Sequence, residues 1–173
     1  VIEDVQAEAD VLAVEVDAPR RLTGSPMAPL PSADPSRAEQ WGLDDLAAET
    51  AWASSTGAGV TVAVIDSGVA QHPDLAGNFV KGTDLVDGTN GRVDPNGHGT
   101  HVAGIIAMTP NNNIGGAGLA PDVSIMPVVV ADASGSVRAS DSAQGIVWAV
   151  DHGADVLNMS YSGSASSVEQ KAI

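Results

Sequence analysis

The pattern of apolar and polar residues differs between two regions of the chain. Residues 1–50 are acidic and interrupted by proline, with a short strand expected at Val11–Val16 and an extended linker at 28–35. From Gly59 onward the pattern is regular and predicts apolar strands at 60–65, 123–130 and 156–159. Helices are expected at 97–108, 140–152 and from 164 to 173, with shorter helical stretches at 36–41 and 43–52.

Strands that alternate with helices predict an α/β fold, a parallel sheet with helices on both faces. Pro127 lies inside the second strand and is expected at an edge or a bulge, because proline has no N–H to donate. In the helix at 140–152, Ile146, Val147 and Val150 are expected to face the sheet. The last helix has no stop signal, and three strands leave a sheet edge unpaired, so we expect the domain to be incomplete in this chain.

The composition narrows the classes of function. Among 173 residues, 22 are acidic and 7 are basic, which gives a net charge of −15. This charge argues against nucleic acid and against an anionic membrane surface as partners, and it favours divalent cations. The sequence has no cysteine, which excludes disulfides, thiol nucleophiles and cysteine-ligated zinc. No apolar run approaches the roughly 18 residues of a membrane helix.

Two short motifs carry residues suited to catalysis. Asp66 follows the first strand. In parallel sheets, ligands and catalytic residues are commonly found at the carboxyl ends of the strands. An isolated Asp-Ser-Gly is, however, more typical of a turn. His98 lies between two glycines at the expected start of a helix, and histidine titrates near neutral pH. His101 follows three residues later, but no acidic third metal ligand stands at helical spacing, so a structural role is favoured for it.

Taken together, the Val-Ile-Asp-Ser-Gly motif and the His-Gly-Thr-His-Val-Ala-Gly motif resemble those of the subtilisin-like serine proteases. Further segments fit that family in the same order, at 72–75, 118–121 and 156–160. The resemblance implies that Asp66 is the triad aspartate and that His98 is the general base and then the general acid. The family's Gly-Thr-Ser-Met-Ala segment, which carries the nucleophile, does not occur in the sequence.

The resemblance also implies a peptide or protein substrate that binds as an added β-strand. One wall of its cleft would be Ser134, Gly135 and Ser136. The other wall would be Ser160, Tyr161 and Ser162, where family members often have Leu-Gly at the second and third positions. Without the resemblance, both segments are equally well explained as flexible Ser/Gly loops.

A structural calcium ion is the cofactor that the resemblance implies. Asp74 and Asn112 would give side-chain oxygens, and carbonyl oxygens would come from Pro110, Ile114 and Gly116. Calcium takes six to eight oxygen ligands. The family's amide ligand near the N-terminus has no clear match, since Arg37 falls near its place and Gln40 lies a few residues late. An ordinary Asn/Gly turn is the alternative.

An acidic loop contains Asp84, Asp87 and Asp94. For this loop, a solvated turn is favoured over a second calcium site. Asp94 is also a candidate to approach His98.

The resemblance implies that the chain has two parts. Residues 1–35 are expected to be the end of an inhibitory prodomain and its linker, and 36–173 the N-terminal part of a subtilisin-like catalytic domain that stops before the serine segment. The predicted protein is a secreted serine endopeptidase made as a zymogen, and this chain alone is expected to be inactive. The alternative is a non-catalytic calcium-binding or interaction domain of the same fold.

Overall fold

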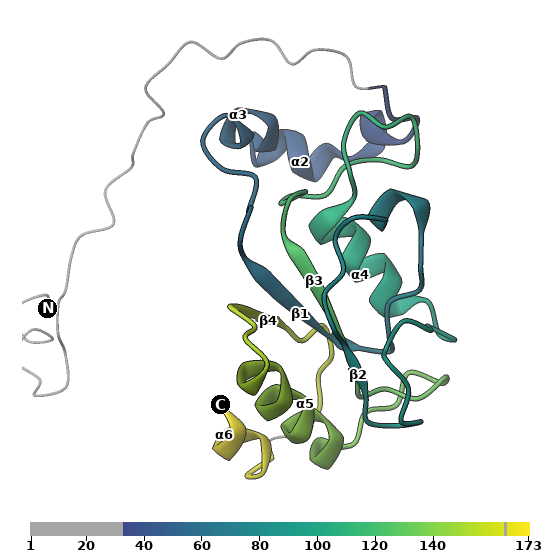
Figure 1. Cartoon of the computed structure of the whole chain (residues 1–173), viewed down its shortest axis with the longest axis vertical. Helices are drawn as coiled ribbons and strands as arrows, with labels where there is room; N and C mark the ends of the chain where they lie inside the picture. The colour runs from purple at the N-terminus through teal and green to yellow at the C-terminus, as the bar shows by residue number, and fades with distance from the viewer. Residues whose placement is uncertain (1–32, 165) are drawn as a thin grey trace, which may run out of the picture.

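The computed structural model describes residues 33–164 and 166–173 (Figure 1). The strand expected at Val11–Val16, most of the linker at 28–35 and nearly all of the expected prodomain lie outside these residues. In chain order the elements are η1 (Arg37–Glu39), α2 (Trp41–Asp45), α3 (Ala48–Trp52), β1 (Thr61–Asp66), η2 (Pro73–Leu75), β2 (Thr83–Asp84), α4 (His98–Ala107), β3 (Ser124–Val129), α5 (Ala139–Asp151), β4 (Val156–Asn158) and α6 (Glu169–Ala172).

The described residues form one parallel sheet in the order β2-β3-β1-β4. β1 lies in the interior, with Thr61 opposite Ser124 in β3 and Val62 opposite Val156 in β4. The three predicted strands are therefore confirmed. β2 was not predicted, because a strand of two residues has no recognisable periodicity.

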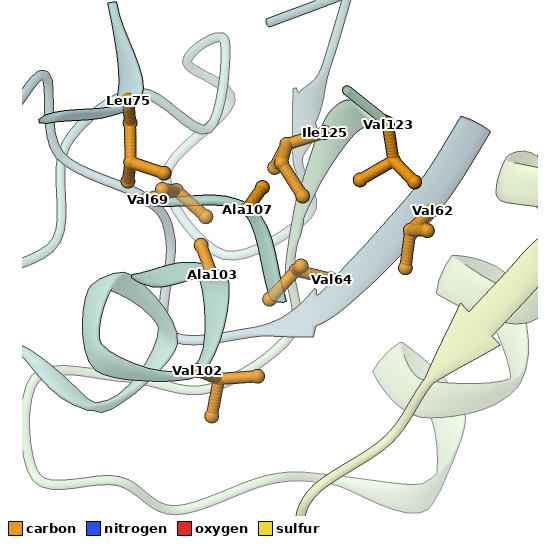
Figure 2. Close-up of a cluster of buried hydrophobic side chains, with 9 residues drawn as sticks. All are labelled: Val62, Val64, Val69, Leu75, Val102, Ala103, Ala107, Val123 and Ile125. Carbon is orange, nitrogen blue, oxygen red and sulfur yellow. The ribbon is translucent and has the colours of Figure 1, made fainter. Parts of the chain in front are cut away.

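Side chains of β1 alternate between two cores, one on each face of the sheet. Val62 and Val64 pack with α4 on one face, in the cluster drawn in Figure 2. Ala63 and Ile65 pack with α5 on the other face. Figure 1 shows these two helices on opposite sides of the strands. The predicted α/β fold, a parallel sheet with helices on both faces, is confirmed.

The inward face of α5 differs from the prediction. Ile146 is 1% exposed as expected, but Val147 and Val150 are 47% and 57% exposed, so their predicted burial is wrong. Apart from Asp141, the other buried residues of α5 are small: Ser142, Ala143, Gly145 and Ala149. At Gly145 an added Cβ would lie 2.7 Å from a side-chain carbon of Val130, which is closer than real Cβ atoms approach. The helix therefore lies too close to the sheet to turn its valines inward.

The position of Pro127 also differs from the prediction. β3 is an interior strand with regular pairing to β1, so Pro127 lies neither at an edge nor in a bulge. Ile125, two residues earlier, exchanges backbone hydrogen bonds with Asn78 and Val80 on the β2 side. Alternation along a strand turns the missing N–H of Pro127 to that same side. There the β2 ladder starts only at Thr83, so no donor is needed.

The N-terminal helical stretches are shorter than expected. The helix predicted at 43–52 is divided into α2 and α3 by Ala47, whose backbone has a positive φ of 51°. α6 has four residues of the longer helix that was expected at the chain end. Within the described part of the chain, no helix has the length and apolar character needed to span a membrane.

Candidate active site

Asp66 lies at the carboxyl end of β1, with its side chain 4% exposed. Its Oδ1 accepts a hydrogen bond of 2.7 Å from the backbone N–H of Ser67. The chain then turns sharply at Gly68, which has a φ of 113° and where a Cβ would overlap the carbonyl oxygen of Val93. The rigid strand and the turn therefore place a buried carboxylate at the carboxyl end of the central strands.

His98 is the first residue of α4, and its side chain is 49% exposed. Its Nδ1 lies 2.8 Å from Oδ1 and 2.9 Å from Oδ2 of Asp66. A carboxylate accepts hydrogen bonds, so Nδ1 carries the hydrogen and Nε2 is the proton-accepting nitrogen of the neutral ring. The two motifs that the sequence singled out thus form one Asp–His pair.

Gly99 allows this pair to form. A Cβ at this position would overlap the carbonyl oxygen of Gly68 and would lie 3.1 Å from both Cβ and Oδ1 of Asp66. Only a residue without a side chain lets the first turn of α4 pack against the end of β1. The glycine after His98 is therefore part of the geometry of the pair.

Asp94 does not bond to His98, although the sequence made it a candidate to approach the ring. Its carboxylate accepts hydrogen bonds of 2.8 Å from the backbone N–H groups of Gly97 and Thr100 at the start of α4. Burial opposes ionisation of Asp94, but hydrogen bonds from Thr100, Gly97 and Ser67 outweigh it and lower the pKa of this carboxyl. Asp94 is thus a charged cap of the helix that carries His98.

The Asp–His pair opens into a hollow of about 190 Å³. Of the predicted substrate residues, Gly135, Ser160 and Tyr161 line this hollow together with the pair. The Tyr161 hydroxyl forms a 2.8 Å hydrogen bond with the Ser142 hydroxyl, and burial is the main cause that raises its pKa. The hollow therefore joins parts of both predicted walls next to His98.

The other predicted substrate residues lie outside this hollow. Ser134 and Ser136 are exposed in a tight hairpin, where both donate backbone hydrogen bonds to the Asp132 carboxylate. Hydrogen bonds from the Ser134 hydroxyl and these backbone groups lower the pKa of Asp132. Ser162 lines a neighbouring depression with Tyr161.

The predicted calcium residues are brought together in part. Asp74 is 0% exposed, and its Oδ1 accepts a 2.7 Å hydrogen bond from the side-chain N–H of Asn112. The side-chain oxygen of Asn112, predicted as a ligand, instead accepts a 2.8 Å hydrogen bond from the backbone N–H of Ile114. Its Oδ2 is buried without a hydrogen-bond partner among the described residues. A Cβ at Gly115 would overlap this oxygen. An unpaired carboxylate oxygen under a glycine loop fits a hard cation, because such a group is costly to bury alone.

Asp34 holds the same loop and was missed by sequence reasoning. It is 5% exposed, and its carboxylate accepts hydrogen bonds from three successive backbone N–H groups, at Asn111, Asn112 and Asn113. An isolated acid in a proline-rich stretch carries no signal for this role. The nearby side chain of Gln40 bonds to both backbone groups of Ala117.

The acidic loop behaves as a set of turns. Asp84 accepts hydrogen bonds from the backbone of Val86 and Asp87 and from the Thr89 hydroxyl. Across residues 33–164 and 166–173, no group of three histidine or acidic side chains is arranged to hold a metal ion.

Comparison with known proteins gives the same family at sequence and structure level. The model of the subtilase family matches residues 57–173. Thermitase from Thermoactinomyces vulgaris is 45% identical over 126 residues, which cover 72% of this chain and 45% of thermitase. Subtilisin Savinase from Lederbergia lenta is 44% identical over 135 residues, which cover 77% of this chain and 49% of that protein.

A solved structure described as proteases from Pseudoalteromonas arctica PAMC 21717 has a TM-score of 0.74 and 34% identity to this chain. The alignment covers 82% of this chain and 54% of that one. The chain thus spans about half the length, or less, of the relatives that it matches. The matched region contains β1, α4 and the Asp66–His98 pair. This chain belongs to the subtilase family.

Proposed function

We propose that this chain contributes the aspartate and histidine of an Asp-His-Ser triad in a serine endopeptidase. The observation that carries the proposal is the contact of His98 Nδ1 with both carboxylate oxygens of buried Asp66, beside a hollow at the edge of the sheet. Family membership and relatives named thermitase and subtilisin support it. The substrate is a peptide or protein chain, bound along the hollow.

In this mechanism, His98 Nε2 accepts the proton of the attacking serine hydroxyl and later gives it to the leaving amine. Asp66 keeps the hydrogen on Nδ1 and stabilises the imidazolium that forms. The nucleophilic serine belongs to a segment that this 173-residue sequence does not contain. We therefore expect no turnover from this chain by itself.

A hybrid protein tests the proposal directly. It joins the whole chain to the part of Subtilisin Savinase that follows the matched region, and hydrolysis of casein is the assay. His98→Ala and Asp66→Asn are expected to lower kcat by about 10⁴-fold or more, the scale of losses in such triads. His101→Ala is the matched control, because His101 is an exposed histidine on the same helix.

Two outcomes would contradict the proposal. Casein hydrolysis that survives His98→Ala would remove His98 as the base. A folded hybrid without any activity would favour the alternative, a non-catalytic calcium-binding or interaction domain.

We also propose that Asp74 binds a structural calcium ion with the loop at 110–116. The buried Oδ2 of Asp74 would be a ligand, together with carbonyl oxygens of Pro110, Ile114 and Gly116. Asn112 would exchange its present hydrogen bonds with Asp74 and Ile114, so that its side-chain oxygen also faced the ion. Calcium bound only to the native state would stabilise it, by about 2.7 kcal/mol at a concentration 100 times Kd.

Calorimetric titration with Ca²⁺ tests this site. Asp74→Asn is expected to weaken binding and to remove the rise in unfolding temperature that calcium causes. Asp87→Asn is the control, since it removes the same charge from an exposed loop position. Equal affinity in the wild type and in Asp74→Asn would rule out calcium at Asp74.

We further propose that the protein is secreted and that residues 1–35 end an inhibitory prodomain. The relatives named subtilisin and alkaline protease support an extracellular enzyme. N-terminal sequencing of the protein from culture medium tests both points, with a mature start near residues 33–40 as the expected result. Recovery only from the cell interior would contradict secretion.

A further inference from the structure

The Ser67 hydroxyl lies between two carboxylates. Its Oγ is 2.8 Å from Oδ1 of Asp94 and 3.2 Å from Oδ1 of Asp66. The same oxygen accepts a 3.1 Å hydrogen bond from the backbone N–H of Gly99. Ser67 is 1% exposed, so bulk water does not compete for these contacts. A hydroxyl has one hydrogen to donate and can satisfy only one of the two carboxylates.

The distances favour donation to Asp94, because 2.8 Å is a normal O–H···O length and 3.2 Å is beyond the usual range. Asp94 is also held ionised by its other donors, Thr100 and Gly97, so it remains an acceptor at neutral pH. Oδ1 of Asp66 then keeps two close donors, the backbone N–H of Ser67 at 2.7 Å and His98 Nδ1 at 2.8 Å.

We propose that Asp94 is a positioning residue that acts on the Asp66–His98 pair through the Ser67 hydroxyl. Because Asp94 accepts the hydrogen of the Ser67 hydroxyl, this hydroxyl does not compete with the His98 imidazole for the Asp66 carboxylate. Without Asp94, the hydroxyl would turn to Asp66 Oδ1 and add a third donor there. The negative charge would be shared more widely, and the Nδ1–H···O bond of His98 would weaken. This inference rests on the proposed function, which assigns the pair to catalysis.

We call this action of Asp94 on the Asp66–His98 pair through the Ser67 hydroxyl the relay. The signal of the His98 Nδ1 proton in NMR spectra of the whole chain tests it. This proton moves downfield as its hydrogen bond strengthens. Asp94→Ala, which removes the acceptor, is expected to move it upfield, whereas Ser67→Ala is not, since that change removes the competing donor. In the double variant, the upfield shift caused by Asp94→Ala is expected to disappear. This non-additivity is the signature of an action that passes through Ser67.

Two controls separate the relay from simpler effects. Thr100→Val loosens the same helix start by removing the Thr100 hydroxyl, another donor to Asp94, and Asp87→Asn removes the same charge from an exposed loop position. Both are expected to shift the proton signal less than Asp94→Ala does. An Asp94→Ala shift that persists in full in the Ser67→Ala background would overturn the proposal.

Neutron diffraction gives an independent measurement in case Asp94→Ala does not fold. A deuterium on Ser67 Oγ that points to Asp94 supports the relay, and one that points to Asp66 contradicts it. Neither measurement depends on proteolysis. Failure of the relay is therefore distinct from failure of the endopeptidase assignment, which the casein assay decides.

Discussion

Replacement of Gly99 by alanine should separate the Asp66–His98 pair without touching either residue. The added Cβ would lie 3.1 Å from Cβ and Oδ1 of Asp66 and would overlap the carbonyl oxygen of Gly68. Ordinary carbon contacts need about 3.5 Å or more, so the first turn of α4 must move by at least about 0.4 Å. N–H···O bonds extend to about 3.2 Å. That movement stretches the contacts of 2.8 and 2.9 Å between His98 and Asp66 to about 3.2 and 3.3 Å, the limit of a hydrogen bond, so the pair is expected to weaken.

The loss of stability caused by Gly99→Ala can be compared with the effect of Gly104→Ala in the same helix. Overpacking at Gly99 is expected to destabilise the chain by about 1–3 kcal/mol. At Gly104, a Cβ would meet only the Met108 side chain, at 3.6–3.8 Å, which is ordinary contact. Gly104→Ala should therefore gain helix propensity, by about 1 kcal/mol at most. The two variants are expected to differ in free energy of unfolding by roughly 1–4 kcal/mol.

Urea unfolding followed by circular dichroism measures this difference, and NMR of the His98 Nδ1 proton reports the pair. In the Savinase hybrid, Gly99→Ala is expected to lower kcat by about 10²-fold, the cost of a misplaced catalytic group. Equal stability of the two alanine variants, with an unchanged Nδ1 proton signal, would refute the close-packing argument.

Three further predictions concern stability. Ile146→Ala is expected to cost about 2–5 kcal/mol by leaving a cavity, whereas Val147→Ala should cost under about 1 kcal/mol; equal urea midpoints would contradict the assigned face of α5. Asp84 is partly desolvated, which opposes ionisation, but its hydrogen bonds prevail and hold its pKa below 3.8. The contribution of ionised Asp84 to stability is present above about pH 4 and is lost as pH falls through the lowered pKa. Asp84→Asn should therefore flatten the acid side of the curve of unfolding free energy against pH. An unchanged slope in this variant would argue against the linkage. Asp34→Ala removes three hydrogen bonds to the loop at 111–113 and should speed amide exchange there more than at β1, which hydrogen-exchange NMR measures.

Much of the fold was predictable from local pattern. The β-branched run at 60–65 predicted β1, and strands alternating with helices predicted the parallel sheet, because burial on both faces requires nearly continuous apolar strands. The local pattern did not predict burial correctly where it depends on how closely neighbouring elements pack. Val147 and Val150 are as apolar as Ile146, but close approach of α5 at Gly145 leaves them at the surface.

The sequence by itself determined the family, the two catalytic candidates and their order, because a motif places the residues that chemistry needs within a few positions of one another. Only the tertiary structure brought Asp66 to His98 and linked the Ser67 hydroxyl to Asp94. It also placed Asp34 against a loop 77 residues away. Such hydrogen bonds depend on distances between distant segments, and those distances are set by how closely the helices and turns pack on the sheet.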